Sequence, residues 1–369
     1  MPQRPEVVDL FCGAGGLTLG SHNAGFVTRS AFDVDGDLTS NFNENFPAAS
    51  LYRIDLDEAS AGDVAALVGG GRVAGVIGGP PCQGFSEIGR RQQTDPRNAL
   101  VGRFMAVVAK LRPKFFLMEN VPGLGHDRYS TILERALDQI PSTYTVLEKL
   151  SLNAADYGAA TDRSRMVVLG YDPSCVDALT SADIFNACVR QNVTVRDAIR
   201  DLPAPTASDE CESLEYVDDA PISTYAAQMR CPPPKGISGE RARALNRQGR
   251  VTGVGRTVHT KAVVERFGTT TPGERDPISR YPRLSWDKTA PVLRAGTGRD
   301  RGSFQAARPI HPEAPRVISV REAARLQGFP DWFQFSRTKW HSHRMIGNSV
   351  SPLFAEAIMK VIRPRIDAT

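Results

Sequence analysis

The stretch that decides the fold is Val7-Val-Asp-Leu-Phe-Cys-Gly13-Ala-Gly15-Gly16-Leu-Thr-Leu-Gly20. Four of its first five residues are apolar, as in a buried strand, and a glycine-rich turn leads from them into a helical pattern near 17–24. Glycines in such a turn let the backbone approach a ligand, and the free N–H groups at the helix start can bind an anion. Dinucleotide sites prefer the spacing GxGxxG, which this turn lacks. We therefore expect a strand–turn–helix unit that binds a ligand.

Beyond this unit, the first 170 residues alternate short apolar runs with helical patterns. We expect strands near 7–11, 27–32, 73–77, 115–118, 144–150 and 166–170, and helices near 17–24, 58–68, 99–111 and 129–139. Strand–helix alternation with short connections predicts an α/β fold with a doubly wound, Rossmann-like sheet. Prolines and glycines break the pattern from about 172 to 285, which predicts a smaller domain of mixed or irregular structure. Helical patterns return near 319–327 and 350–362.

The composition excludes several classes of protein. The chain has 369 residues, 41% of them hydrophobic and 23% charged, as in an ordinary globular protein. Its six cysteines form no CxxC pair, which argues against a disulfide framework or a zinc site and favours a reducing compartment. No run approaches the roughly 18 apolar residues of a membrane span, and the N-terminus lacks a signal segment. We expect a cytoplasmic protein without a membrane partner.

The charge is unevenly distributed along the chain. Residues 172–222 carry 11 acidic and 3 basic side chains, whereas residues 225–310 carry 17 Lys and Arg against 6 Asp and Glu. A segment so rich in arginine is typical of a nucleic-acid footprint, because the guanidinium fork fits phosphates and guanine edges. The alternative is an ordinary solvated surface.

Two aspartates follow the next apolar runs. Asp33 directly follows the run 27–32, where a carboxylate can accept both hydroxyls of a ribose. Asp55 follows the next short apolar stretch along the chain, where it can accept an adenine amino group. With the glycine-rich turn they describe a site for a nucleoside that carries a small carboxylate, and S-adenosylmethionine fits this description better than NAD. The spacing of Asp33 and its neighbours imitates a calcium loop, but Leu38 stands where that loop needs glycine. We expect no metal.

The run Val76-Ile-Gly-Gly-Pro80-Pro-Cys82-Gln-Gly-Phe-Ser86 places a cysteine just past an apolar strand. Because prolines and glycines shape the turn, the Cys82 thiol is expected to be rigidly held and exposed. Such a thiol is a candidate nucleophile if its pKa is lowered; a buried structural cysteine is the alternative.

Glu119 ends the apolar run 115–118, and adjacent strands of an open α/β sheet deliver their ends to one crevice. A carboxyl at this position is costly unless it is paired or protonated, and a protonated one can act as a general acid. A structural salt bridge or helix cap is the alternative.

Six motifs occur in a fixed order along the chain. They are Asp9-Leu-Phe-Cys-Gly-Ala-Gly-Gly16, Gly79-Pro-Pro-Cys-Gln-Gly-Phe-Ser86, Glu119-Asn-Val121, Arg163-x-Arg165, Arg325-Leu-Gln-Gly-Phe-Pro-Asp331 and Gly347-Asn-Ser-Val350. In this order they resemble the bacterial or phage form of the S-adenosylmethionine-dependent DNA (cytosine-5) methyltransferase family, over residues 7–170 and about 285–360.

The resemblance implies an organisation and partners. A cofactor-binding catalytic domain is expected at 1–175, a target-recognition domain at 176–315 with its core at about 190–285, and a C-terminal segment at 316–369 that returns to the catalytic domain. The family also implies a monomer that acts on duplex DNA near the nucleoid, with a restriction endonuclease as a genetic partner.

The resemblance also implies a chemistry. Cytosine C5 is too poor a nucleophile to attack a sulfonium methyl group unaided, and addition of a thiolate to C6 makes it enamine-like. By resemblance, Cys82 is this thiolate and Glu119 holds or donates the proton at N3. The target cytosine must first be flipped out of the base stack. Arg163 and Arg165 are implied beside the flipped base and its phosphate.

Further contacts follow from the same resemblance. The expected cofactor-binding residues are Phe11, Gly13, Gly15, Gly16, Asp33, Val34, Asp55, Pro80, Asn348, Ser349 and Val350. The segment 83–98 resembles the family's mobile loop, and its expected DNA-binding residues are Gln83, Ser86, Arg90, Arg91 and Arg97. One departure concerns Thr161, which stands where the family usually has glutamine and has a shorter reach.

Two alternatives stay open. The first is methylation of cytosine in transfer RNA by an enzyme of the same family, against which Gln83 and the long basic insert count. The second is a catalytically decayed DNA-binding module, against which the intact Cys82, Glu119, Arg163 and Arg165 count.

Overall fold

The computed structural model describes residues 4–81, 99–147, 149–189, 192–206, 213–216, 222–295 and 308–366. Within these ranges, no helix is long and apolar enough to cross a membrane.

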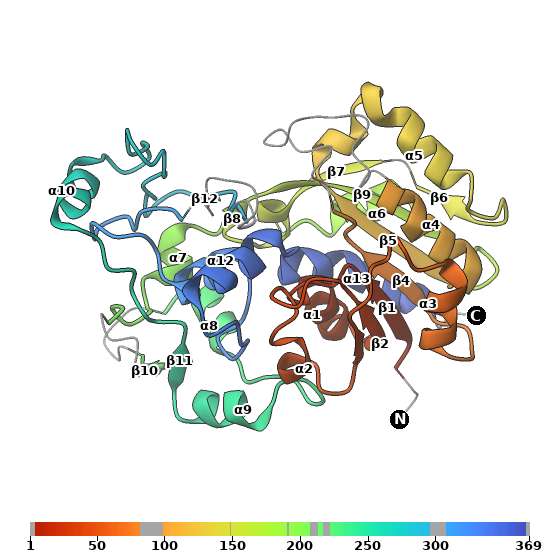
Figure 1. The fold of residues 1–369 in the computed structure, drawn as a ribbon, viewed down its shortest axis with the longest axis horizontal. Coiled ribbons are helices and arrows are strands. Elements are labelled where there is room, and N and C mark those ends of the chain that lie inside the picture. The colour runs from red at the N-terminus through yellow and green to blue at the C-terminus, as the bar shows by residue number, and fades with distance from the viewer. Residues whose placement is uncertain are drawn as a thin grey trace.

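A central sheet organises the first half of the chain (Figure 1). Its strand order is β3-β2-β1-β4-β5-β9-β6, and β7 also pairs with β9. The strands are β1 (Glu6–Leu10), β2 (Val27–Phe32), β3 (Ser50–Tyr52), β4 (Gly75–Gly78), β5 (Phe115–Asn120), β6 (Thr145–Val146), β7 (Leu150–Asn153) and β9 (Ser164–Tyr171). Strands β1 to β5 are parallel, whereas β9 runs antiparallel to β5, β6 and β7. The predicted α/β class is confirmed.

Helices cover both faces of this sheet. They are α1 (Gly16–Asn23), α2 (Phe42–Asn45), α3 (Ala61–Val68), α4 (Ala99–Leu111), α5 (Ser130–Leu137), α6 (Ser181–Asn186) and α13 (Pro352–Ile366), with short 3₁₀ turns η2 (Pro122–Gly125), η3 (Asp127–Tyr129) and η4 (Ala154–Tyr157). Because side chains alternate along a strand, Val7 of β1 packs toward α1 and α13, whereas Val8 packs toward α3, α4 and α5.

The contact between α1 and α13 is unusually close. A Cβ atom at Gly20 would lie 2.4 Å from the Cβ of Ala355, so only glycine allows the two helices to approach this far. The amide of Asn23 also donates to Glu356, 333 residues away in the sequence (2.9 Å). The last long helix therefore completes one face of the sheet that the first residues begin.

The rest of the chain forms a second, mixed part. It contains the helices α7 (Val195–Ile199), α8 (Thr224–Arg230), α9 (Glu240–Arg247), α10 (Lys261–Thr269), α11 (Val320–Gln327) and α12 (Lys339–Asn348), and the small sheets β10 (Ser213–Glu215) with β11 (Arg250–Thr252) and β8 (Thr161–Asp162) with β12 (Ala290–Pro291). Residues of α7, α8, α11 and α12 share one apolar core. Thus α11 packs with the second part, while α13 lies on the central sheet (Figure 1).

Some expected elements differ from the observed ones. The expected strand 144–150 is divided into β6 and β7, because the two pair with different parts of the long strand β9. Strand β6 pairs with residues 170–171 of β9, and β7 pairs with residues 164–167. The expected strand at 7–11 ends at Leu10, since Phe11 turns the backbone into the left-handed region with φ of 60°. The short strand β3 and helix α12 were not expected.

Candidate active site

The glycine-rich turn after β1 has an open side. Phe11, Gly13 and Gly15 all have positive φ, and a left-handed conformation costs a non-glycine residue about 1–2 kcal/mol. At Gly15 a Cβ atom would lie 2.4 Å from the ring of Phe46, so the turn is closed there. At Gly13 a Cβ atom would meet nothing within 4 Å. The backbone at Gly13 therefore faces free space that a ligand can occupy.

Asp33 holds this turn from the end of β2. Its Oδ2 accepts from the Gly13 N–H (2.8 Å), and its Oδ1 accepts from the Asp35 N–H (2.8 Å). Burial raises the pKa of Asp33, although these two hydrogen bonds oppose the shift. The next residue, Val34, is an apolar side chain with 62% of its surface exposed, and Asp55 is exposed just after β3. The carboxyl ends of β1, β2 and β3 thus bring the expected nucleoside contacts to one edge of the sheet.

Asp9 lies inside β1, close to this turn, and is not among the predicted site residues. It is fully buried, and its Oδ2 accepts from the Thr18 hydroxyl (2.6 Å), while its Oδ1 has no hydrogen-bond partner among the described residues. Burial, with a further contribution from the charge of Asp33, raises the pKa of Asp9 to about 7. The available signal was an acid that stands between apolar residues of this strand.

The C-terminal segment closes the turn from the other side. A Cβ atom at Gly16 would lie 2.1 Å from the carbonyl oxygen of Val350, so these two backbones are in contact. Asn348 is exposed at the end of α12, and the carbonyl of Ser349 accepts from the amide of Gln327 (2.7 Å). Residues 348–350 therefore lie beside the glycine-rich turn, as the resemblance implies.

A buried ion pair stands at the end of β5. Oε1 of Glu119 lies 2.6 Å from Nε of Arg165, which β9 carries as the antiparallel neighbour of β5. Glu119 is 8% exposed, so pairing with Arg165 offsets the cost of placing a carboxylate there. A Cβ atom at Gly79 would lie 3.1 Å from Oε2 of Glu119, and the carbonyl of Pro80 accepts from the amide of Asn120 (3.1 Å). The chain that leads toward residue 82 thus passes directly beside the Glu119 carboxyl.

Several predicted residues lie outside the described ranges. They are the expected nucleophile Cys82 and the expected DNA contacts Gln83, Ser86, Arg90, Arg91 and Arg97.

Arg163 and Arg165 have different partners among the described residues, and their expected place beside the flipped base stays a prediction. Arg163 is buried, and its guanidinium donates to the main-chain carbonyls of Leu293 (3.1 Å) and Gly347 (3.0 Å). The nearby Thr161 is also buried and donates to the carbonyl of Pro291 (3.4 Å). Arg163 therefore ties β8, the 290–295 segment and the end of α12 together.

The comparisons with known proteins agree with this geometry. The model of the family described as C-5 cytosine-specific DNA methylase matches residues 6–363. The chain belongs to this family. The predicted DNA (cytosine-5) methyltransferase is thereby confirmed at the level of the family.

The methylase is similar to proteins of known name along nearly its whole length. It is 39% identical to the Type II methyltransferase M.XorII of Xanthomonas oryzae pv. oryzae, over 98% of this chain and 86% of that protein. It is 32% identical to the Type II methyltransferase M.DdeI of Desulfomicrobium norvegicum, over 97% of this chain and 88% of that protein.

Solved structures also resemble the methylase. A putative DNA modification methyltransferase encoded within an E. coli prophage has a TM-score of 0.85 at 37% identity, covering 98% of this chain and 99% of that one. The S. pombe Dnmt2 methyltransferase has a TM-score of 0.65 at 17% identity, covering 99% of this chain and 100% of that one, and shares the fold.

The described residues of the methylase contain no group of three or more His, Cys, Asp or Glu side chains that could hold a metal ion. The open Gly13 backbone, the exposed Val34 and the carboxylates of Asp33 and Asp55 instead fit a nucleoside cofactor.

Proposed function

We propose that the methylase transfers a methyl group from S-adenosylmethionine to C5 of a specific cytosine in duplex DNA, after base flipping and through a covalent bond between Cys82 and C6. The Glu119–Arg165 pair is the observation that carries this proposal. It places a carboxyl with a fixed orientation beside Gly79 and Pro80, next to the segment that holds Cys82. The same edge of the sheet carries the glycine-rich turn.

The residues of this chain divide the work as follows. The Cys82 thiolate adds to C6, which turns C5 into a nucleophile, while Glu119 holds a proton at N3 and Arg165 fixes the orientation of Glu119. S-adenosylmethionine, when bound, supplies an electrophilic methyl group on its sulfonium sulfur. Loss of the C5 proton to a base then expels the Cys82 thiolate and leaves 5-methylcytosine.

The cofactor is proposed to lie across the carboxyl ends of β1 to β3. Gly13, Gly15 and Gly16 would bring the backbone to its amino-acid end, whereas Asp33 and Asp55 would accept from the ribose and the adenine. Phe11 and Val34 would pack on the adenosyl group, and Pro80 with residues 348–350 would close the site. The exposed side chain of Val34 supports this placement, because it lies next to Asp33 and is free to pack on a ligand.

We propose the domain limits 1–175, 176–315 and 316–369, with the second domain recognising the target. The methylase would act as a monomer on chromosomal DNA in the cytoplasm, with a restriction endonuclease as its genetic partner. The Type II relatives support this biological setting.

The proposed activity is tested by transfer of tritiated methyl groups to duplex DNA and to transfer RNA under the same conditions. We expect incorporation into DNA alone, and bisulfite sequencing of DNA from expressing cells should show one methylated target sequence. A duplex with 5-fluorocytosine at that target should trap a covalent complex, because fluorine blocks loss of the C5 substituent. Incorporation into transfer RNA would favour the RNA alternative, and absence of both transfer and trapping would favour the decayed module.

Replacement of Gly13 by alanine tests the cofactor site. We expect at least a tenfold loss of affinity for S-adenosylhomocysteine by calorimetry, because the new methyl group occupies the open side of the turn. Gly249, between α9 and β11, is the matched control: its φ of 64° resembles the 52° of Gly13, and a Cβ atom there also meets nothing within 4 Å. Gly249→Ala should carry a similar strain of about 1–2 kcal/mol without loss of affinity. Equal affinities of the two variants would contradict this placement.

A further inference from the structure

The segment after α10 folds into a short hairpin, which we call the 273–283 hairpin. The Gly273 N–H donates to the carbonyl of Arg283 (2.8 Å), and the Arg283 N–H donates to the carbonyl of Glu274 (2.8 Å). Nearer the tip, the Asp276 N–H donates to the carbonyl of Tyr281 (2.9 Å). These bonds fix the two arms of the hairpin against each other.

Asp276 holds the tip of the hairpin to α10. Its carboxylate is fully buried and accepts from Nε of Arg266 on α10 (2.6 Å). It also accepts from the N–H (2.5 Å) and the hydroxyl (2.7 Å) of Ser279. One buried acid therefore defines both the turn and its attachment.

Arg283 anchors the base of the hairpin. Its buried guanidinium donates to the carbonyls of Phe267 (2.8 Å), Thr270 (2.8 Å), Pro312 (3.1 Å) and Glu313 (2.7 Å). These carbonyls belong to the end of α10 and to the bend at 312–313. Because the contacts of Arg283 and Asp276 order this loop before it meets a ligand, binding costs it little conformational entropy.

The tip presents an apolar side chain to solvent. Ile278 is 73% exposed, and the exposed arginines Arg275 and Arg280 stand on either side of it, with Glu274 as the exposed acid of the hairpin. Arg280 has a φ of 61°, a strained value for a residue with a side chain. The Ile278 side chain is therefore free to contact a ligand, and two exposed cations flank it.

Other arginines of the basic segment form ion pairs within the chain. Arg230 pairs with Asp201 (2.7 Å), Arg250 with Glu215 (2.9 Å) and Arg266 with Asp276 (2.6 Å). Among the described carboxylates, none forms an ion pair with Arg275 or Arg280. Arg275 and Arg280 are thus available to a polyanion, as are other exposed cations of the segment such as Lys235 and Lys288.

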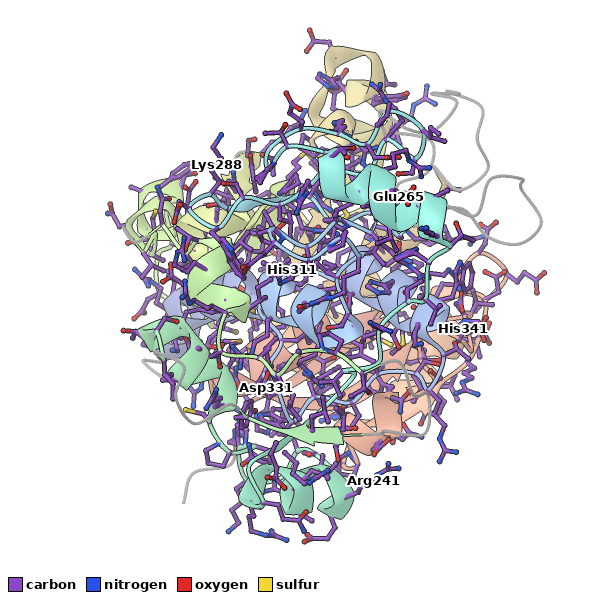
Figure 2. All side chains as sticks on the ribbon, turned by 90° about the vertical axis from the view of Figure 1, so that its left-hand side faces the viewer. Arg241, Glu265, Lys288, His311, Asp331 and His341 are labelled. Carbon is purple, nitrogen blue, oxygen red and sulfur yellow. The ribbon has the colours of Figure 1, made fainter. Side chains whose placement is uncertain are left out.

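The position of α10 suits contact with a long ligand. Figure 1 shows α10 at the end of the molecule that lies away from α3 and α5, with β8 and β12 between them. Strand β8 leads into β9, which carries Arg165 of the buried pair. Figure 2 shows Glu265 of α10 and Arg241 of α9 at opposite ends of one face, so the hairpin and the basic helix α9 are separate surfaces.

We propose that the 273–283 hairpin is an element with which the methylase reads its target in duplex DNA. Ile278 packs on the apolar edge of a base pair, for which a thymine methyl group is the natural partner in the major groove. Arg275 and Arg280 bind the phosphates on either side. This proposal rests on the proposed function, because duplex DNA is the substrate assumed there.

The test compares Ile278→Ala with wild-type enzyme bound to S-adenosylhomocysteine, on a duplex that contains the mapped target and on one that lacks it. We expect about a tenfold loss of affinity for the target duplex and less than a threefold change for the other, since one apolar base contact is removed. The variant Arg275→Gln/Arg280→Gln should weaken both duplexes and lower the salt slope of log affinity by about 2. Phe185→Ala, an exposed apolar residue on α6, is the matched control and should bind like wild type.

The outcomes separate the two proposals. Wild-type protein that neither binds nor methylates duplex DNA would overturn the proposed function and the hairpin proposal with it. Wild-type activity with an Ile278→Ala variant that binds the target normally would overturn the hairpin proposal alone. A change of molar mass by light scattering in Ile278→Ala, without a change of DNA affinity, would show that Ile278 contacts a second copy of the chain and would also overturn it.

Discussion

Glu119→Gln is expected to lower the rate of methyl transfer by about 10²–10⁴, the range for loss of a positioned acid–base group. Glutamine preserves the size of the side chain but removes the charge that pairs with Arg165 and the group that holds a proton at N3. Because Glu119 stands outside the glycine-rich turn, affinity for S-adenosylhomocysteine should be unchanged. Single-turnover transfer to the target duplex measures the first quantity, and calorimetry measures the second.

Two variants serve as controls for this result. Cys82→Ser gives the lower limit of the transfer rate, since we expect no methyl transfer without the thiolate. Glu6→Gln is the matched control, because Glu6 also pairs with an arginine, Arg29. This pair lies at the start of β1, at the end of the strands opposite to the proposed site, so the rate should not change. A Glu119→Gln enzyme that keeps the wild-type rate would remove Glu119 from the chemistry.

Arg325→Met is expected to lower the free energy of unfolding by about 3–5 kcal/mol, as for a buried ion pair that loses one partner. Arg325 is fully buried and binds Asp331 through two hydrogen bonds (2.6 and 2.7 Å) and Asp201 through two more (both 3.1 Å). Methionine fills most of the volume but leaves both carboxylates buried with less compensation. Urea denaturation followed by tryptophan fluorescence measures the loss.

The pH dependence distinguishes this cause from poor packing. Burial alone would raise the pKa of Asp331, but the charge of Arg325 keeps this pKa below its ordinary value. Without Arg325 the effect of burial prevails, so the ionised carboxylate destabilises the variant increasingly as the pH rises. The difference from wild type should therefore be larger at pH 8 than at pH 5. A difference independent of pH would assign the loss to packing.

The exposed pair of Arg247 and Glu240 on α9 provides the control for this experiment. Its ion pair has a distance of 2.6 Å, but both side chains are largely in solvent. Arg247→Met should change stability little, since water replaces the lost partner.

The sequence predicted those parts of the site that depend on local chemistry. Asp33 follows a strand that neighbours β1, so its contact with Gly13 could be expected from the rule that parallel strands share an edge. The same rule correctly placed Glu119 near the turn at Gly79. In both cases the position of the acid at or just beyond the end of a strand was enough to predict its place at this edge of the sheet.

The remaining parts depend on contacts between distant segments. Nothing around Arg163 indicates that its guanidinium is used by the carbonyls of Leu293 and Gly347, because main-chain acceptors leave no trace in a sequence. The pairing of Arg165 with Glu119 needed the register of β5 and β9, which periodicity does not provide. The ion pairs within the chain could not be read from the sequence either, so the count of arginines in 225–310 overstated the positive charge that is available to a ligand.

The backbone contact between Gly16 and Val350 has a consequence for how the enzyme is made. The ribosome makes the glycine-rich turn and α1 well before α13, because 333 residues separate Asn23 from its partner Glu356. Until translation reaches α13, the side of α1 that packs on this helix stays uncovered and is open to chaperones and proteases. A chain cut short before α13 would lack this support for α1 and the glycine-rich turn, so the turn depends on residues that are made long after it.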